Sequence, residues 1–160
     1  MIDLKVEMIV LNLAALFFFF CGQVTGDASD CGSPAMKISS ISIVPDPPSA
    51  GQAAFLTAIG TMNSVVKNGS IAFDVFYLGI PLFSANALTC GNSTIQFPLN
   101  AGSILIEGLQ NCPTSVGQSQ SVNISVTLPA ITPPGDYVII WNATDQNNNG
   151  AYCINATFTE

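Results

Sequence analysis

Apolar and polar residues alternate with a period of two over most of the chain after residue 36, a pattern typical of β-strands. Clusters of Pro, Gly and Asn separate the alternating segments, and no window shows the 3.6-residue period of an amphipathic helix. Six or seven short strands joined by polar turns predict an all-β fold, a β-sandwich. We expect strands over residues 37–44, 53–61, 70–78, 103–106, 120–128, 137–144 and 151–158.

The alternation also sorts the side chains between two faces of each strand. If Asn123, Asn142, Asn155 and Asp74 face solvent, large apolar side chains share the opposite, inner face. This parity does not distinguish a filled interior from a hollow one. The inward residues would be Val122, Ile124, Val126 and Leu128; Tyr137, Ile139 and Trp141; Ile154, Ala156 and Phe158; and Ile71, Phe73, Val75 and Tyr77.

The start of the chain has a different character. Residues 8–21 form an apolar run of about 14 residues, shorter than the roughly 20 that a membrane span needs. The small residues Val24 and Gly26 occupy positions −3 and −1 of a cut before Asp27, which predicts a signal peptide over residues 1–26. The alternative is an uncleaved N-terminal anchor. Cleavage would leave residues 27–160 as one domain in the secretory pathway, either secreted or in the endosomal or lysosomal lumen.

Composition removes several classes of function. The 160 residues include three lysines, no arginine and no histidine, and the formal net charge is −7. Such a chain has no basic surface for nucleic acid and no His for a Ser-His-Asp or Cys-His site. The acids Asp74, Asp136 and Asp145 fit solvent-facing or turn positions, and no two acids near them are close in sequence. We therefore expect no enzyme.

Four of the five cysteines remain once Cys21 leaves with the signal peptide, and an even number in a secreted chain predicts two disulfides. Three connectivities are possible, and we expect the nested one, Cys31–Cys153 with Cys90–Cys112. The absence of a CxxC pair and of His argues against a metal site, and we expect no cofactor. Five Asn-x-Ser/Thr sequons predict a glycoprotein: Asn68, Asn92, Asn123, Asn142 and Asn155.

Ordered landmarks along residues 31–158 resemble one protein family. They are Cys31-Gly32, the Pro-Asp-Pro-Pro stretch at 45–48, Gly79-Ile80-Pro81, Cys90, Cys112-Pro113, Leu128-Pro129, the Pro-Gly-Asp-Tyr stretch at 134–137, Trp141, Asp145 and Cys153. This set is similar to the ML lipid-recognition domain family. That family includes the small sterol carrier of the Niemann–Pick type C pathway, mite allergens, and phosphatidylglycerol/phosphatidylinositol transfer proteins. The proline-rich stretches look most like the phospholipid-transfer branch.

The resemblance implies an immunoglobulin-like sandwich with an apolar cavity between its sheets, and the same two disulfides. The cysteines of a third disulfide, common in the sterol-carrier branch, are absent here. Residues around 90–112, including Ile95, Phe97, Leu99 and 104–106, are expected either at the cavity mouth or in a small satellite core. Inward parity and the resemblance together predict lipid contacts for Phe73, Val75, Tyr77, Ile80, Leu82, Phe83, Leu128, Ala130, Ile131, Tyr137, Ile139, Trp141 and Ile154, for each of which plain core packing is the alternative.

These expectations combine into one function. The chain resembles a soluble lipid-binding and transfer protein that carries a phospholipid or sterol in the cavity. Its partners would be the lipid and, transiently, a membrane or a membrane lipid-transport protein, with the protein itself a monomer. The alternative is a secreted recognition or adhesion sandwich with a filled core and no lipid cargo.

Overall fold

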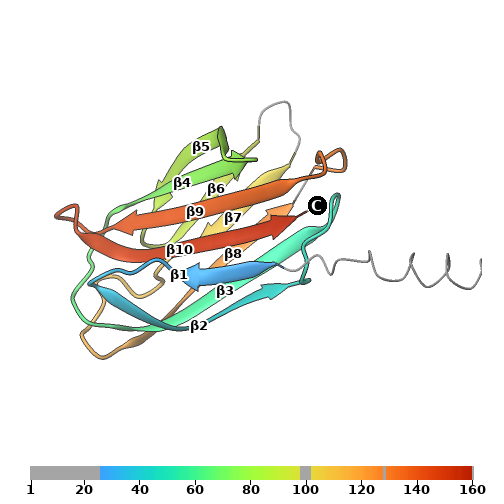
Figure 1. Cartoon of the computed structure of the whole chain (residues 1–160). Coiled ribbons are helices and arrows are strands. Elements are labelled where there is room, and N and C mark those ends of the chain that lie inside the picture. Colours follow the sequence, from blue (N-terminus) through green and yellow to red (C-terminus); the bar gives the residue numbers. More distant parts are fainter. Residues whose placement is uncertain (1–25, 98–101, 128, 160) are drawn as a thin grey trace, which may run out of the picture.

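The structure is a computed structural model of the whole chain, and it describes residues 26–97, 102–127 and 129–159. Ten antiparallel strands form two packed five-stranded sheets (Figure 1). One sheet has the order β1-β10-β9-β4-β5 and the other the order β2-β3-β8-β7-β6. The strands are β1 (Asp27–Asp30), β2 (Met36–Val44), β3 (Ala53–Met62), β4 (Ser70–Tyr77), β5 (Ile80–Leu88), β6 (Asn92–Gln96), β7 (Ser103–Glu107), β8 (Ser119–Thr127), β9 (Asp136–Thr144) and β10 (Gly150–Thr159).

The expected sandwich is confirmed, and the predicted alternation holds in its central strands. In β4, Ile71, Phe73 and Val75 are buried, while in β9 Tyr137, Ile139 and Trp141 are buried. The inner faces of both sheets supply one continuous core, as their period-two patterns require. The signal-peptide prediction, Cys21 and Leu128 fall outside the described residues. Within the described part, no helix is long and apolar enough to cross a membrane.

The structure has three strands more than the seven predicted segments. The additional strands β1, β5 and β6 all lie at sheet edges, where a strand has one pairing neighbour and a weak alternation is sufficient. Pro and Gly were expected to separate the strands, yet Pro81 lies inside β5. It is tolerated there because β5 is an edge strand and the ladder shifts register opposite Val75 and Phe76.

Both predicted disulfides are present and cluster towards one end of the sandwich. Cys31 follows β1 and bonds to Cys153 in β10, and Cys90 bonds to Cys112 across 22 residues. We call this the closed end; it is the left-hand end in Figure 1 and includes the turn between β9 and β10. The opposite end, where β4 and β8 finish and β9 begins, is called the open end.

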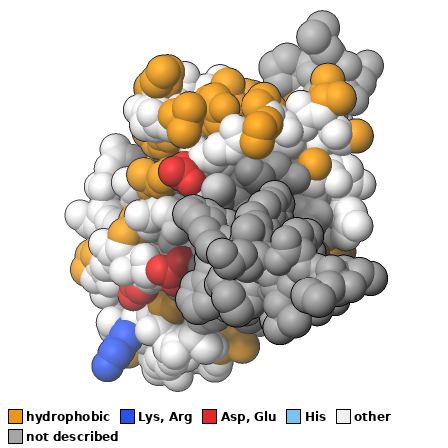
Figure 2. All heavy atoms as spheres, turned by 45° about the vertical axis from the view of Figure 1, so that its right-hand side comes forward, with side chains coloured by type: hydrophobic (Ala, Val, Ile, Leu, Met, Phe, Trp, Pro, Cys, Tyr) orange, Lys and Arg blue, Asp and Glu red, His pale blue; other side chains and the backbone are white. Residues whose placement is uncertain are grey.

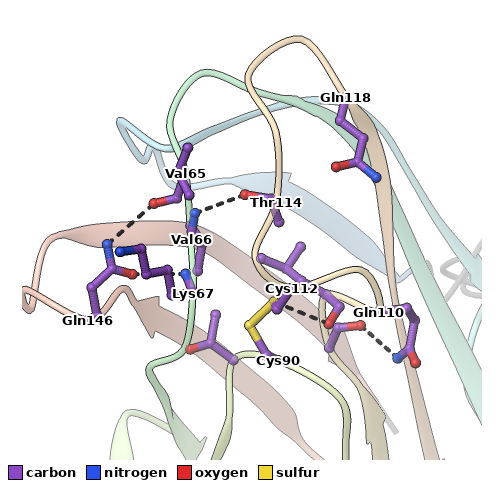
Figure 3. The surroundings of a disulfide bond; sticks show 12 residues. Val65, Val66, Lys67, Cys90, Gln110, Cys112, Thr114, Gln118 and Gln146 are labelled. Carbon is purple, nitrogen blue, oxygen red and sulfur yellow. Dashed lines mark hydrogen bonds between the residues drawn. A yellow bond between two sulfur atoms is a disulfide. The ribbon is translucent and has the colours of Figure 1, made fainter.

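Side-chain hydrogen bonds join the loops of the closed end (Figure 3). Gln146 accepts from the backbone N–H of Lys67 and donates to the carbonyl of Val65, at 2.9 and 3.3 Å. The Thr114 hydroxyl oxygen accepts from the N–H of Val66 at 2.8 Å. Asp145 accepts from two backbone N–H groups of its own turn, chiefly that of Asn147, and these bonds hold the pKa of its carboxyl below the usual value.

The five sequons differ in their surroundings. Asn68, Asn92 and Asn142 have exposed side chains, as an acceptor of a glycan requires. Asn123 is half-buried: its amide donates to Glu107 at 3.1 Å, and its oxygen accepts from Thr57 at 3.0 Å. Asn155 is also half-buried, on β10. Glycosylation stays a prediction, favoured most at the three exposed positions.

Candidate functional site

An apolar cavity of about 270 Å³ lies between the sheets at the open end. Its walls come from β4, β5, β8, β9 and β10, from the end of β6, and from the loop between β8 and β9. Tyr137 is the one ionisable side chain among the lining residues. The lining residues are Phe73, Val75, Leu82, Phe83, Phe97, Val126, Pro129, Ile131, Thr132, Pro133, Tyr137, Ile139 and Phe158.

A series of aromatic rings forms one side of this cavity. Phe73 packs edge-on against Trp141 at 5.5 Å between ring centroids, and Phe83 follows Phe73 at 6.3 Å. Phe83 then meets Phe97 at 5.4 Å, again edge-on. Because Phe83 belongs to β5 and Phe97 follows β6, this last contact joins the two sheets at their edge. Edge-to-face packing of this kind adds to plain area burial, so the rings form a well-defined apolar wall.

Two tyrosines fix the loop over residues 129–135, which lines the cavity mouth. The Tyr77 hydroxyl donates to the carbonyl of Pro134 at 2.9 Å, and the Tyr137 hydroxyl donates to that of Pro133 at 2.8 Å. Gly135, with φ of 147°, allows this close approach, because a Cβ there would lie 2.8 Å from the Tyr77 ring. The loop thereby holds Ile131 at the mouth, with its side chain 90% exposed.

A smaller cavity of about 40 Å³ adjoins the first and shares Val126, Ile139 and Phe158 with it. Its remaining walls are also apolar, and they come from Trp141, Ile124 and Ala156, from β2 and β3, and from Pro48. The shared residues separate two neighbouring spaces, so a movement of these three side chains would join them. The interior of the open end is therefore hollow in two places along the same inner face.

A third hollow, of about 320 Å³, lies on the outer face of the β2-β3-β8-β7-β6 sheet. It is the largest of the three by volume, but Glu107, Asn123 and Thr57 line it together with Phe55 and Leu105. Its polar groups already bond to one another, and it is open to solvent on the outside of the sandwich. We therefore take the cavity between the sheets as the candidate site, because among these three hollows of the described residues it combines an almost wholly apolar lining with a useful volume.

The structure brings seven of the thirteen predicted lipid-contact residues into the main cavity, and Trp141 lines the smaller one. Four others lie elsewhere. Tyr77 anchors the 129–135 loop, Ile80 is 67% exposed outside the cavity, and Ala130 is exposed on the loop. Ile154 is fully buried in the core, where it pairs with Trp141. The seven are Phe73, Val75, Leu82, Phe83, Ile131, Tyr137 and Ile139.

Six lining residues were not in the predicted set. Val126 and Phe158 were already inward by parity, so the signal for them was present. Phe97 belongs to the segment expected either at the mouth or in a satellite core. It lines the cavity, whereas Ile95, Ile104 and Ile106 are buried in the core and Leu99 is outside the described residues. No pattern pointed to the other three, Pro129, Thr132 and Pro133, which belong to a loop.

Among the described residues, no lysine lines the cavity. The described lysines, Lys37 and Lys67, are at the closed end, at the start of β2 and in the loop before β4. Asp145 and Tyr152 have shifted pKa values, and neither lines the cavity. Among the described residues, no group of three or more His, Cys, Asp or Glu side chains is placed to hold a metal ion. The lining of the site offers apolar burial.

Comparison with known proteins bears on the same region. A family model described as ML domain matches residues 26–160, a range that includes every residue the structure describes. The chain belongs to the ML domain family. It is 32% identical over 147 residues to a Dictyostelium discoideum protein named "putative phosphatidylglycerol/phosphatidylinositol transfer protein", covering 89% of this chain and 94% of that one. It is 27% identical over 132 residues to a phosphatidylglycerol/phosphatidylinositol transfer protein of Candida albicans, covering 82% and 61%.

Solved structures of this fold include a Niemann-Pick type C2 protein from the Japanese carpenter ant. It aligns with a TM-score of 0.56 at 18% identity, over 83% of this chain and 98% of that one. Chicken MD-1 complexed with lipid IVa aligns with a TM-score of 0.58, also at 18% identity, over 86% and 90%. At this identity the likeness concerns the fold of an ML domain.

Proposed function

We propose that this ML domain protein binds the acyl tails of a phospholipid in the cavity at the open end and transfers the lipid between membranes. The observation that carries the proposal is the apolar cavity of about 270 Å³ between the sheets, which no charged side chain lines. The names of the Dictyostelium and Candida relatives support a phospholipid as cargo. A sterol is the second candidate, because the ML family includes a small sterol carrier.

Affinity for such a ligand would come from burial of hydrocarbon. Each methylene that leaves water for an apolar cavity contributes about 0.8 kcal/mol, so an acyl chain binds without a charged partner. The headgroup would stay at the mouth. An anionic headgroup would be held there by hydrogen bonds, because both described lysines lie at the other end of the sandwich.

The rival proposal, a recognition or adhesion sandwich, requires a filled interior. The two adjoining hollows at the open end count against it, because a core packed for stability leaves few voids larger than a water molecule. An enzyme is disfavoured by the absence of ionisable groups other than Tyr137 in the cavity. For its location we propose the secretory route, with residues 1–26 removed as a signal peptide and two disulfides formed in an oxidising compartment.

The direct test is extraction and mass spectrometry of lipid from protein purified from its own cells. We expect one phospholipid class in near-stoichiometric amount. Ile139→Trp directs a larger ring into the cavity and should reduce lipid loading at least tenfold. The matched control, Val138→Trp, places the same ring on the outer face of β9 and should leave loading unchanged.

A second filling variant from the opposite sheet, Val126→Phe, guards against a folding failure of Ile139→Trp. Circular dichroism of each variant establishes that the sandwich is intact. Wild-type protein that carries no lipid, or filled variants that load normally, would make the recognition sandwich the better proposal.

A further inference from the structure

Four large aliphatic side chains surround the mouth of the cavity and point into solvent. Leu78, Ile80, Leu82 and Ile131 are 58, 67, 62 and 90% exposed. Leu82 and Ile131 line the cavity itself. Leu78 lies beside them, because its backbone N–H donates to the carbonyl of Asp136 at 2.9 Å, directly after the 129–135 loop. We call these four residues the rim. Figure 2 brings the open end forward and shows hydrophobic side chains gathered over its upper part.

The tip of the β4–β5 hairpin is the most unusual part of the rim. Leu78 and Gly79 form a two-residue turn between Tyr77 and Ile80, and both have positive φ, 49° and 78°. Turns of this type favour Asn-Gly or Gly-Gly, because a branched aliphatic residue is strained in the left-handed region. Folding alone would therefore select against a leucine at this position. A leucine that is both strained and exposed points to a role outside the folded core.

The charges near the rim indicate which surface it contacts. The open end carries Asp27, Asp46 and Asp136, whereas both described lysines are at the closed end. A negative end repels anionic lipid headgroups and lacks the basic side chains that recognise them. The sequons also leave this end free: Asn68 and Asn92 lie at the closed end, and the other three lie along the sheets.

We propose that the rim inserts into the outer layer of an electrically neutral bilayer, with Leu78 at the hairpin tip as its leading side chain. This inference rests on the proposed function, since it describes how the cavity mouth reaches its lipid. Insertion removes the exposed aliphatic groups from water and places the mouth directly against the acyl chains. Attraction to anionic headgroups plays no part in it.

The test measures binding of the full mature chain to phosphatidylcholine vesicles by flotation. The variant L78N/I80Q changes two rim residues that do not line the cavity. We expect it to weaken vesicle binding about tenfold, equivalent to about 1.4 kcal/mol. The vesicle-to-vesicle transfer rate should fall in proportion, while lipid loaded from ethanol solution, measured by native mass spectrometry, should not change.

The matched control is L88Q/V116Q, which replaces two aliphatic residues of similar exposure, 57 and 65%, at the closed end. It should bind vesicles as the wild type does. Addition of phosphatidylglycerol to the vesicles should weaken wild-type binding, more so at low salt.

Unchanged binding of L78N/I80Q, or binding that requires anionic lipid, would overturn the rim proposal and leave the cavity proposal standing. A wild type that loads no lipid would overturn the cavity proposal itself. Vesicle binding absent in the wild type despite lipid loading would also overturn insertion of the rim.

Discussion

The three tyrosines show how much the role of one residue type depends on its partner. Tyr77 and Tyr137 each donate a hydrogen bond to the 129–135 loop, so their hydroxyl groups have a structural function. Tyr152 is almost fully buried in β10, and its hydroxyl has no hydrogen-bond partner among the described residues. Burial of this unpaired group raises the pKa of the Tyr152 phenol well above its usual value.

The same substitution should therefore have opposite effects at two of these positions. Tyr137→Phe removes the hydrogen bond to the Pro133 carbonyl and should lower the free energy of unfolding by about 1 kcal/mol. Tyr152→Phe removes an unpaired buried hydroxyl and should be neutral or stabilise the fold by up to about 1 kcal/mol. Urea denaturation at pH 7 measures both.

The pH dependence gives a further check on Tyr152. Its folded pKa lies above the unfolded value of about 10, so the folded state holds the proton more tightly. Stability is complete below pH 10 and falls as the pH rises beyond it, when the unfolded phenol ionises. Tyr152→Phe should remove this alkaline loss, whereas Tyr137→Phe should retain it. Equal alkaline loss in wild type and Tyr152→Phe would contradict the assignment of this loss to Tyr152.

Sequence alternation predicted which face a residue occupies but not its depth along the strand. In β9, Tyr137 and Ile139 line the main cavity, while Trp141, two residues further on, has passed into the region of the smaller one. Ile154 has the same inward parity but lies opposite Trp141, in filled core. Depth depends on where the two sheets separate, and a period of two along one strand holds no information on that separation.

At the scale of the element, the central strands were predictable, whereas three of the four edge strands, all but β2, were not. Strands β3, β4, β8, β9 and β10 have two pairing neighbours and one buried face, which forces strict alternation. The edge strand β5 has exposed residues at both parities near its start, because its first residues belong to the rim rather than to the core. The exposed aliphatic residues of the rim therefore interrupt the alternation of apolar and polar positions from which a strand is predicted.

At the tip of the β4–β5 hairpin, the conflict between folding stability and the proposed role of Leu78 can be measured. The left-handed conformation costs a non-glycine residue roughly 1–2 kcal/mol, and Asn tolerates it better than Leu. Leu78→Asn alone should therefore raise the midpoint of thermal unfolding by a few degrees, the shift that about 1 kcal/mol produces in a domain of this size. Differential scanning calorimetry measures the change.

The reverse substitution at a second position provides the control. Asn148 also has positive φ, 61°, in the exposed turn between β9 and β10 at the closed end. Asn148→Leu should lower the unfolding midpoint by a similar amount, with no effect on vesicle binding. If Leu78→Asn instead destabilised the protein, the leucine would contribute to folding and would no longer indicate a functional role.

At the scale of the whole molecule, the sandwich is unequal between its ends. The closed end has both disulfides, side-chain bonds between loops, and fully buried core residues such as Met36, Met62 and Val66. The open end has the cavities and the exposed rim. The sequence predicted the disulfides through the order of the cysteines, but a hollow interior has the same inward residues as a filled one. The resemblance to the ML family, not the alternation, predicted the cavity.

The two disulfides should differ in how much they contribute to the free energy of unfolding. Neither should contribute to lipid binding. Cys31–Cys153 closes a loop of 122 residues and Cys90–Cys112 a loop of 22, for which loop-closure entropy gives about 5 and about 3.5 kcal/mol. C31S/C153S should therefore lower the free energy of unfolding more than C90S/C112S, measured by urea denaturation. Neither bridge contributes a residue to the cavity.

A bound phospholipid stabilises the folded state by an amount set by its affinity and concentration. The increase in unfolding free energy on lipid loading should therefore be the same in wild type, C31S/C153S and C90S/C112S. A smaller increase in C90S/C112S would mean that the loops of the closed end restrict the cavity. The division into a structural closed end and a lipid-binding open end would then be wrong, because the Cys90–Cys112 disulfide would act on the site without touching it.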